Sequence, residues 1–265
     1  MNSFFDSAAT ALSLLLSFDP VLLAIVGRSL AVSALACLLG CIGLMLGAWL
    51  GVARFAGRGV VLTLLNTFLA LPSVVVGLVI YLLLSRSGPL GFLGWLFSFK
   101  AMVMAQTVLV LPVVTALTRQ WIEDAERSHG EQLASLGAGP GMRALLLVWD
   151  ERFALLTVAI TAFGRAISEV GAVMIVGGNI DGFTRVMTTA IALETSKGDL
   201  PLALALGCVL LGVVLVLNTA WRCWGAGVVS SGRPRPPCWK GALHDRAGMA
   251  RIRCGVALGC AMDFA

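Results

Sequence analysis

The chain has 265 residues, of which 58% are hydrophobic and only 12% are charged, and its mean hydropathy is +0.94. This composition excludes an ordinary soluble domain and indicates one helical membrane domain, because the apolar residues gather in runs of about 20. The net charge of +5 does not indicate nucleic-acid binding, since the basic residues lie at the ends of the apolar runs, where they orient membrane helices.

The first 27 residues precede the first long apolar run. Residues 1–19 contain no Lys or Arg, whereas a secretory signal peptide needs a basic start. We therefore expect residues 1–27 to form an N-terminal segment that lies outside the membrane, as a short helix at its interface.

Five apolar runs follow in chain order. They cover residues 29–53, 60–84, 101–117, 153–176 and 200–221. A helix of 25 residues is about 37 Å long and crosses a hydrocarbon core of about 30 Å with some tilt. The pattern predicts an all-α integral membrane protein with about five transmembrane helices in residues 28–224.

Basic residues between the runs predict the orientation. Arginines cluster between runs one and two, between runs three and four, and after run five, whereas the opposite side has fewer basic residues. Because short loops rich in Lys and Arg stay in the cytoplasm, the N-terminus is expected outside and the C-terminus inside. Residues 225–265 are rich in Gly, Pro, Arg and Cys, and we expect a disordered cytoplasmic tail there.

Two prolines interrupt the second and third runs in similar phrases, LALP at Pro72 and LVLP at Pro112. Proline removes a backbone donor, so both positions are predicted helix kinks. They are interpreted either as ordinary kinks of a helical bundle or as points of gating.

A polar stretch of residues 119–152 separates the third and fourth runs. Its charges have helical spacing, and Glu123 and Arg127 are placed to pair across one turn. A short helix at 131–136, a turn in the phrase GAGPG at 137–141 and an amphipathic helix at 143–149 are expected to follow. Physically this device is either a solvated hairpin or a structure that docks into a groove of another protein.

Run four contains two charges, Arg165 and Glu169, near its middle. Each ion costs about 2.5–3.5 kcal/mol at the centre of a membrane helix, and residues four apart lie on one face and can pair. The pair is either structural or part of a translocation pathway. Beyond run four, Thr188 and Thr189 lie on a predicted helix that either lines the outer mouth or forms a re-entrant segment.

Several functions lack their sequence signatures. The seven cysteines show no disulfide or zinc spacing, so no metal site is expected. No lysine follows a glycine, which excludes a phosphate-binding loop, and no run carries a Ser and His pair, two aspartates or H-E-x-x-H. An intramembrane enzyme is therefore disfavoured.

The hairpin also resembles a known motif. Glu131, Ala134 and Gly137 fit E-x-x-A-x-x-G, which is similar to the ATPase-coupling motif of permease subunits of ABC importers. The sequence departs from that motif in having Gln132 and Leu133 after the glutamate. It also has Leu147, Trp149 and Asp150 where the family has Ile, Leu and Pro. The phrases ISEVGAVMIVGGNI, TTAIALETSKGD and NTFLALPSVVVGLVIYLLLSRSGPLG resemble the oxyanion branch of these permeases, most closely the tungstate type, and the resemblance covers about residues 28–221.

The resemblance implies a type I importer permease fold with a cytoplasmic coupling loop. It also implies a homodimer in membrane lipid, a separate ABC ATPase that binds ATP and Mg²⁺, and an external oxyanion-binding protein, with no cofactor in this chain. The expected coupling residues are Glu131, Ala134, Leu136, Gly137, Gly139, Pro140 and Gly141. Molybdate or sulfate are the alternative substrates, and a stand-alone channel or ion-coupled carrier is the alternative of another class.

Overall fold

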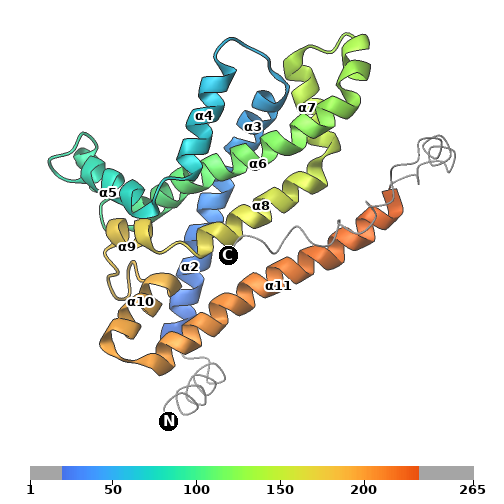
Figure 1. Cartoon of the computed structure of the whole chain (residues 1–265). Coiled ribbons are helices and arrows are strands. Elements are labelled where there is room, and N and C mark those ends of the chain that lie inside the picture. The colour runs from blue at the N-terminus through green and yellow to red at the C-terminus, as the bar shows by residue number, and fades with distance from the viewer. Residues whose placement is uncertain (1–19, 233–265) are drawn as a thin grey trace, which may run out of the picture. The chain divides into compact units, whose positions relative to one another are not determined.

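The computed structural model describes residues 20–232, and these form helices without a strand. Residues 1–19 of the expected interfacial segment 1–27 and residues 233–265 of the expected tail 225–265 lie outside the described residues, whereas residues 225–232, expected in the tail, continue the last helix. The helices, labelled in Figure 1, are α2 (Pro20–Gly40), α3 (Ile42–Val52), α4 (Arg58–Leu69), α5 (Ser73–Leu84), the 3₁₀ helix η1 (Gly91–Leu93), α6 (Phe99–Ser135), α7 (Pro140–Asp150), α8 (Arg152–Ile167), α9 (Gly171–Gly177), α10 (Met187–Lys197) and α11 (Leu200–Gly232).

The chain divides into two compact units, Met1–Arg222 and Cys223–Ala265. The first unit holds α2 to α10 and most of α11. The described part of the second unit is the end of α11, from residue 223 to residue 232.

The long helix α6 organises the first unit. It contacts α2, α3, α4, α5, α7, α8 and α9, and Figure 1 shows it (green) running through the bundle. Its apolar half is the predicted third run, but the helix continues for 37 residues in all, through Pro112 and on to Ser135. The expected separate helix at 131–136 does not exist, because α6 extends through it.

Within residues 20–232, two stretches are long and apolar enough to cross a membrane as they stand. They are Pro20–Val52, which consists of α2 and α3 in succession, and Phe99–Ser135, which is α6. The first begins nine residues before the predicted start at residue 29, so the apolar residues before Arg28 belong to the helix as well.

Two of the predicted spans are broken helices. α4 and α5 meet at an angle of 97° at Pro72, and α8 and α9 meet at 58° at residues 168–170. The two breaks lie against each other, because a Cβ on Gly171 would come within 2.8 Å of the Ser73 hydroxyl oxygen. A kink was predicted at Pro72, where the first break lies. Hydropathy gave no signal of the second break, since a short interruption leaves the apolar character of a run unchanged.

Candidate functional site

The predicted helix, turn and helix device exists at the end of α6. Gly137 ends α6 with φ of +81°, a left-handed conformation that glycine adopts without steric cost. The Ala138 amide donates to the Leu133 carbonyl at 3.1 Å, which closes the end of the helix. Pro140 then occupies the first turn of α7, where its missing N–H is not needed.

All seven expected coupling residues lie in this hairpin. Glu131 and Ala134 are in the last turns of α6, Leu136, Gly137 and Gly139 form the turn, and Pro140 and Gly141 begin α7. These residues are neighbours in the sequence, and the structure adds the turn that joins the two helices of the segment.

α7 has one face buried and one face exposed. Ala144 and Leu147 are buried in a cluster with residues of α3 and α6. The opposite face carries exposed apolar side chains at the i, i+3, i+4 and i+7 spacing of a helical stripe. We call this set the α7 apolar stripe, and it consists of Met142, Leu145, Leu146 and Trp149. Leu136 in the adjoining turn is 81% exposed. An amphipathic helix that shows its apolar face to the outside is typical of a protein-docking element.

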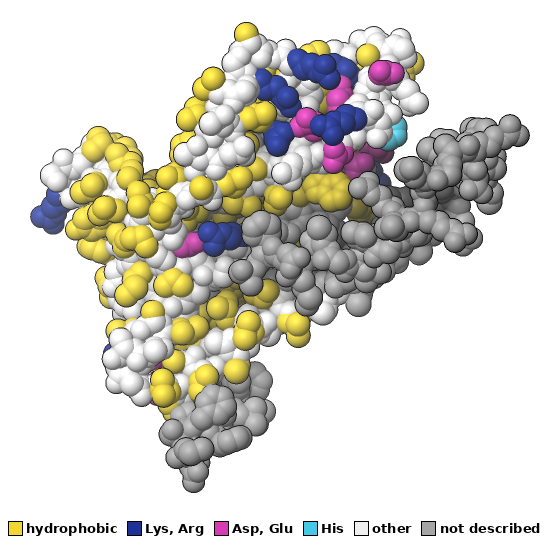
Figure 2. Space-filling view, viewed as in Figure 1, with side chains coloured by type: hydrophobic (Ala, Val, Ile, Leu, Met, Phe, Trp, Pro, Cys, Tyr) yellow, Lys and Arg dark blue, Asp and Glu magenta, His cyan; other side chains and the backbone are white. Residues whose placement is uncertain are grey.

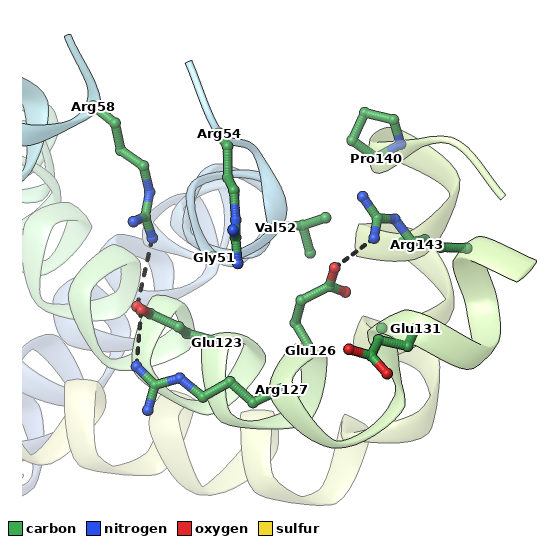
Figure 3. Close-up of a pocket in the computed structure, with 12 residues that line it drawn as sticks. Gly51, Val52, Arg54, Arg58, Glu123, Glu126, Arg127, Glu131, Pro140 and Arg143 are labelled. Carbon is green, nitrogen blue, oxygen red and sulfur yellow. Dashed lines mark hydrogen bonds and ion pairs between the residues drawn. The ribbon is translucent and has the colours of Figure 1, made fainter. Parts of the chain in front are cut away.

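Charged side chains gather at the same end of the molecule. Figure 2 shows most of the visible Lys, Arg, Asp and Glu side chains over the end where α6 and α7 turn. They surround a cavity of about 880 Å³ between the end of α3, α6 and α7, seen in Figure 3. Its lining residues are Gly51, Val52, Arg54, Arg58, Glu123, Glu126, Arg127, Gly130, Glu131, Ala134, Pro140 and Arg143.

Glu123 is the centre of this charged cluster. Its carboxylate pairs with Arg119 at 2.6 Å, with Arg127 at 3.1 Å and with Arg58 at 3.5 Å. The predicted pairing of Glu123 and Arg127 is confirmed. Arg58 also donates to the Leu50 carbonyl at 3.1 and 3.2 Å, so it satisfies an orphan acceptor at the end of α3 and ties α3 and α4 to α6.

A second ion pair joins the two arms of the hairpin. Arg143 of α7 contacts Glu126 of α6 at 2.7 Å, and both side chains are mostly buried. The sequence reasoning missed this pair and the two further arginines on Glu123. Arg119 could have been found from its i, i+4 spacing, whereas Arg58 and Arg143 are brought in by tertiary packing.

The charged pair of run four lies at the break between α8 and α9. Arg165 and Glu169 are 3.5 Å apart, as their spacing predicted. However, α8 ends at Ile167, so Glu169 lies in the break rather than inside a continuous helix. Glu169 is buried, whereas the Arg165 side chain is 57% exposed.

Side chains from two other helices hold this break. The Gln106 amide of α6 donates to the Ala166 carbonyl at 3.0 Å, and the Thr188 hydroxyl of α10 donates to the Glu169 carbonyl at 3.0 Å. A broken helix at membrane depth leaves carbonyls that lipid cannot satisfy, so these two donors stabilise the bend. Thr189 is also buried and bonds to the Val186 backbone. Both threonine hydroxyls are thus satisfied inside the protein.

The exposed face of α8 carries further polar side chains. Thr157 and Thr161 precede Arg165 by eight and four residues, and Ser168 follows it by three, so the four lie on one flank of the helix. The Thr157 and Thr161 hydroxyls donate to carbonyls four residues earlier, at 3.2 and 2.9 Å. Arg165 makes this flank too polar for a lipid-facing surface.

Comparison with known proteins places the chain in a family. No family model matches it. A tungstate uptake system permease protein from Peptoclostridium acidaminophilum is 42% identical over 78% of this chain and 92% of that protein. A probable anion ABC transporter permease protein from Haloferax volcanii is 41% identical over 74% of this chain and 88% of its own length. A tungstate uptake permease from Campylobacter jejuni is 43% identical over 58% of this chain and 65% of its length.

The names of more distant relatives refer to molybdenum and sulfate instead of tungstate. A molybdenum and a sulfate transport permease of Escherichia coli are each 29% identical. These proteins are permease subunits of ABC transporters, which are not themselves enzymes. The resemblance drawn from the sequence phrases is therefore confirmed, and the chain belongs to the family of membrane permease proteins of oxyanion ABC transporters, together with the tungstate uptake permeases.

Proposed function

We propose that this chain is the membrane-spanning subunit of an ATP-driven importer that carries tungstate across the cytoplasmic membrane. In this proposal a soluble binding protein delivers the anion on the outer side, and a separate ATPase that binds ATP and Mg²⁺ supplies the energy. The observation that carries the choice of tungstate is the 42% identity to a tungstate permease, against 29% to the molybdenum and sulfate permeases. Molybdate or sulfate remain the alternative substrates.

The topology that fits this function has five spans. We assign them to α2 with α3, α4 with α5, α6, α8 with α9, and α11. The arginine-rich end with the hairpin is then cytoplasmic by the positive-inside rule, with the N-terminus outside and the C-terminus inside. Five spans are few to enclose a pathway, so a two-fold homodimer is proposed, with the anion path between its copies.

The hairpin is proposed to be the ATPase-coupling element. On the face of α7 opposite the α7 apolar stripe, Ala144 and Leu147 pack on α3 and α6. A force applied to the stripe is therefore transmitted to two membrane helices. Closure of the ATPase pair would tilt these spans through α7.

Replacing Leu145 with glutamate tests this assignment. Leu145 is exposed, so the change leaves the bundle intact, but it places a charge in the middle of the proposed docking face, where an unpaired ion is costly. We expect loss of co-purification with the cognate ATPase and loss of uptake. Glu131→Lys and Gly137→Asp are expected to act in the same direction.

Ser135→Glu is the matched control, because Ser135 is exposed on the same hairpin but lies outside the α7 apolar stripe. It should keep the ATPase bound. Normal ATPase association and uptake in the Leu145→Glu protein would refute the coupling role.

The Arg165 and Glu169 pair is proposed to hold the bend at the anion path. Arg165 exposes positive charge on the polar flank of α8, and Glu169 limits its attraction so that the anion is released. Because each single replacement with alanine leaves the other charge unpaired, both should impair tungstate uptake. The double variant should recover part of the uptake if the pair is structural. A double variant no better than the worse single one would count against pairing.

A further inference from the structure

α4 contributes little to the core of the first unit. None of its residues is buried by the described part of the chain. Leu62 and Leu65 are half-buried, and the helix contacts α6. Figure 1 shows α4 (cyan) turning sharply away from α5. Most of its surface is therefore left for another molecule or for lipid.

The rest of α4 has two different flanks. At about 100° per residue, one flank carries large apolar side chains and the other carries small and polar ones. We call these the apolar flank, Val60, Val61, Leu64 and Phe68, and the polar flank, Gly59, Thr63, Asn66 and Thr67. All eight residues are exposed. The apolar flank matches lipid, and the polar flank does not.

Asn66 is the residue on the polar flank that most needs a partner. The hydroxyls of Thr63 and Thr67 donate to carbonyls of their own helix, at 2.9 and 2.8 Å. The Asn66 amide has no hydrogen-bond partner among residues 20–232. It lies eight residues along α4 from Arg58, about 12 Å from the arginine-rich end, which in the proposed topology places it inside the hydrocarbon layer. An amide at that depth is stabilised by a hydrogen bond to another helix.

We propose that the polar flank of α4 is the face through which two copies of this chain meet, with Asn66 bonding to the partner's polar flank. The occupant is a second copy because an amide both donates and accepts, so it complements itself across a two-fold axis. Thr63 and Gly59 present little bulk on this flank, and small residues let two membrane helices approach closely. This inference rests on the homodimer in the proposed function and names its contact helix.

Cysteine cross-linking in membranes tests the proposal on the full chain expressed with its ATPase. The seven native cysteines are replaced, and a single cysteine is introduced at Asn66 or, as the matched control, at Leu64. The two positions are at nearly the same depth but on opposite flanks. Asn66→Cys should give a covalent dimer with a short thiol cross-linker, and Leu64→Cys should remain monomeric on a denaturing gel.

A second measurement guards against a misfolded cysteine-free chain. A photo-cross-linking amino acid at Thr63, in the chain with its own cysteines, should give the same dimer, and one at Val61, about 160° away around the helix, should not. Cross-linking at Leu64 and Val61 but not at Asn66 and Thr63 would overturn the proposal.

The mass of the purified transporter separates this inference from the proposed function. Two copies per complex without any Asn66 or Thr63 cross-link would contradict the contact face alone. One copy per complex would contradict the homodimer itself. Uptake and ATPase association test the importer function independently of both results.

Discussion

Replacing Gly47 with valine is expected to prevent normal folding of the permease. An ideal Cβ at Gly47 of α3 would lie 2.5 Å from the Thr115 carbonyl oxygen and 2.8 Å from the Thr118 Cβ of α6. These atoms belong to the backbone and to a β-branched side chain of a packed helix, so they cannot move aside singly. Overpacking of this kind costs about 3 kcal/mol, at the upper end of the usual range.

Gly27→Val is the matched control for this prediction. Gly27 lies in the preceding helix α2, and a Cβ there would meet no atom within 4 Å. We expect the Gly47→Val protein to accumulate poorly in membranes and to unfold at a lower temperature in detergent, whereas Gly27→Val behaves like the native chain. Equal unfolding temperatures for the two variants would show that α3 does not pack on α6 as described.

Replacing Glu123 with alanine is expected to disable the cytoplasmic end of the protein. The Glu123 carboxylate pairs with three arginines. Its side chain is 25% exposed, and those of Arg119 and Arg58 are 18% and 26% exposed. A hydrogen bond to a charged group contributes about 1.5–3 kcal/mol to stability, and partial exposure to solvent reduces this contribution. Loss of the carboxylate therefore leaves Arg119 and Arg58 close together without their shared counter-ion, and it removes the ion pair that links the start of α4 to α6.

The neighbouring Asp124→Ala variant provides the comparison. Asp124 is exposed, and within residues 20–232 its carboxylate pairs with Arg127 alone, at 3.5 Å. Exposed pairs of this kind contribute about 0–1 kcal/mol. Thermal unfolding and tungstate uptake should both fall in Glu123→Ala and stay near native in Asp124→Ala. Similar behaviour of the two proteins would mean that the Glu123 cluster is not needed to hold this end together.

Much of the fold could be predicted from hydropathy. The five apolar runs all lie in helices, and the Gly and Pro residues at 137–141 correctly predicted the turn of the hairpin. These features depend on local sequence, since a left-handed glycine or a proline at the start of a helix has the same effect in any context.

The helix breaks could be predicted only in part. Pro72 is a local signal for the bend between α4 and α5. The bend between α8 and α9 has no proline, and it depends on donors from Gln106 and Thr188, which are 60 and 19 residues from the carbonyls they bind. Such long-range hydrogen bonds leave no pattern in a single sequence.

The candidate site shows the same division. The i, i+4 spacing of Glu123 and Arg127 predicted their pairing, but the convergence of Arg58 on the same carboxylate required α3 and α4 to fold back onto α6. Thr188 and Thr189 were expected on a helix that either lines an outer mouth or forms a re-entrant segment. Their hydroxyls bond to backbone carbonyls inside the protein, an arrangement that polarity alone does not distinguish from exposure.

The measurement that tests the central claim most directly is uptake of labelled tungstate by cells with and without this gene, each challenged with excess molybdate or excess sulfate. A dedicated tungstate importer predicts gene-dependent uptake that neither competitor reduces. Efficient competition by molybdate or sulfate would contradict tungstate specificity and indicate a broader oxyanion importer, and uptake that is independent of the gene would contradict the proposed function.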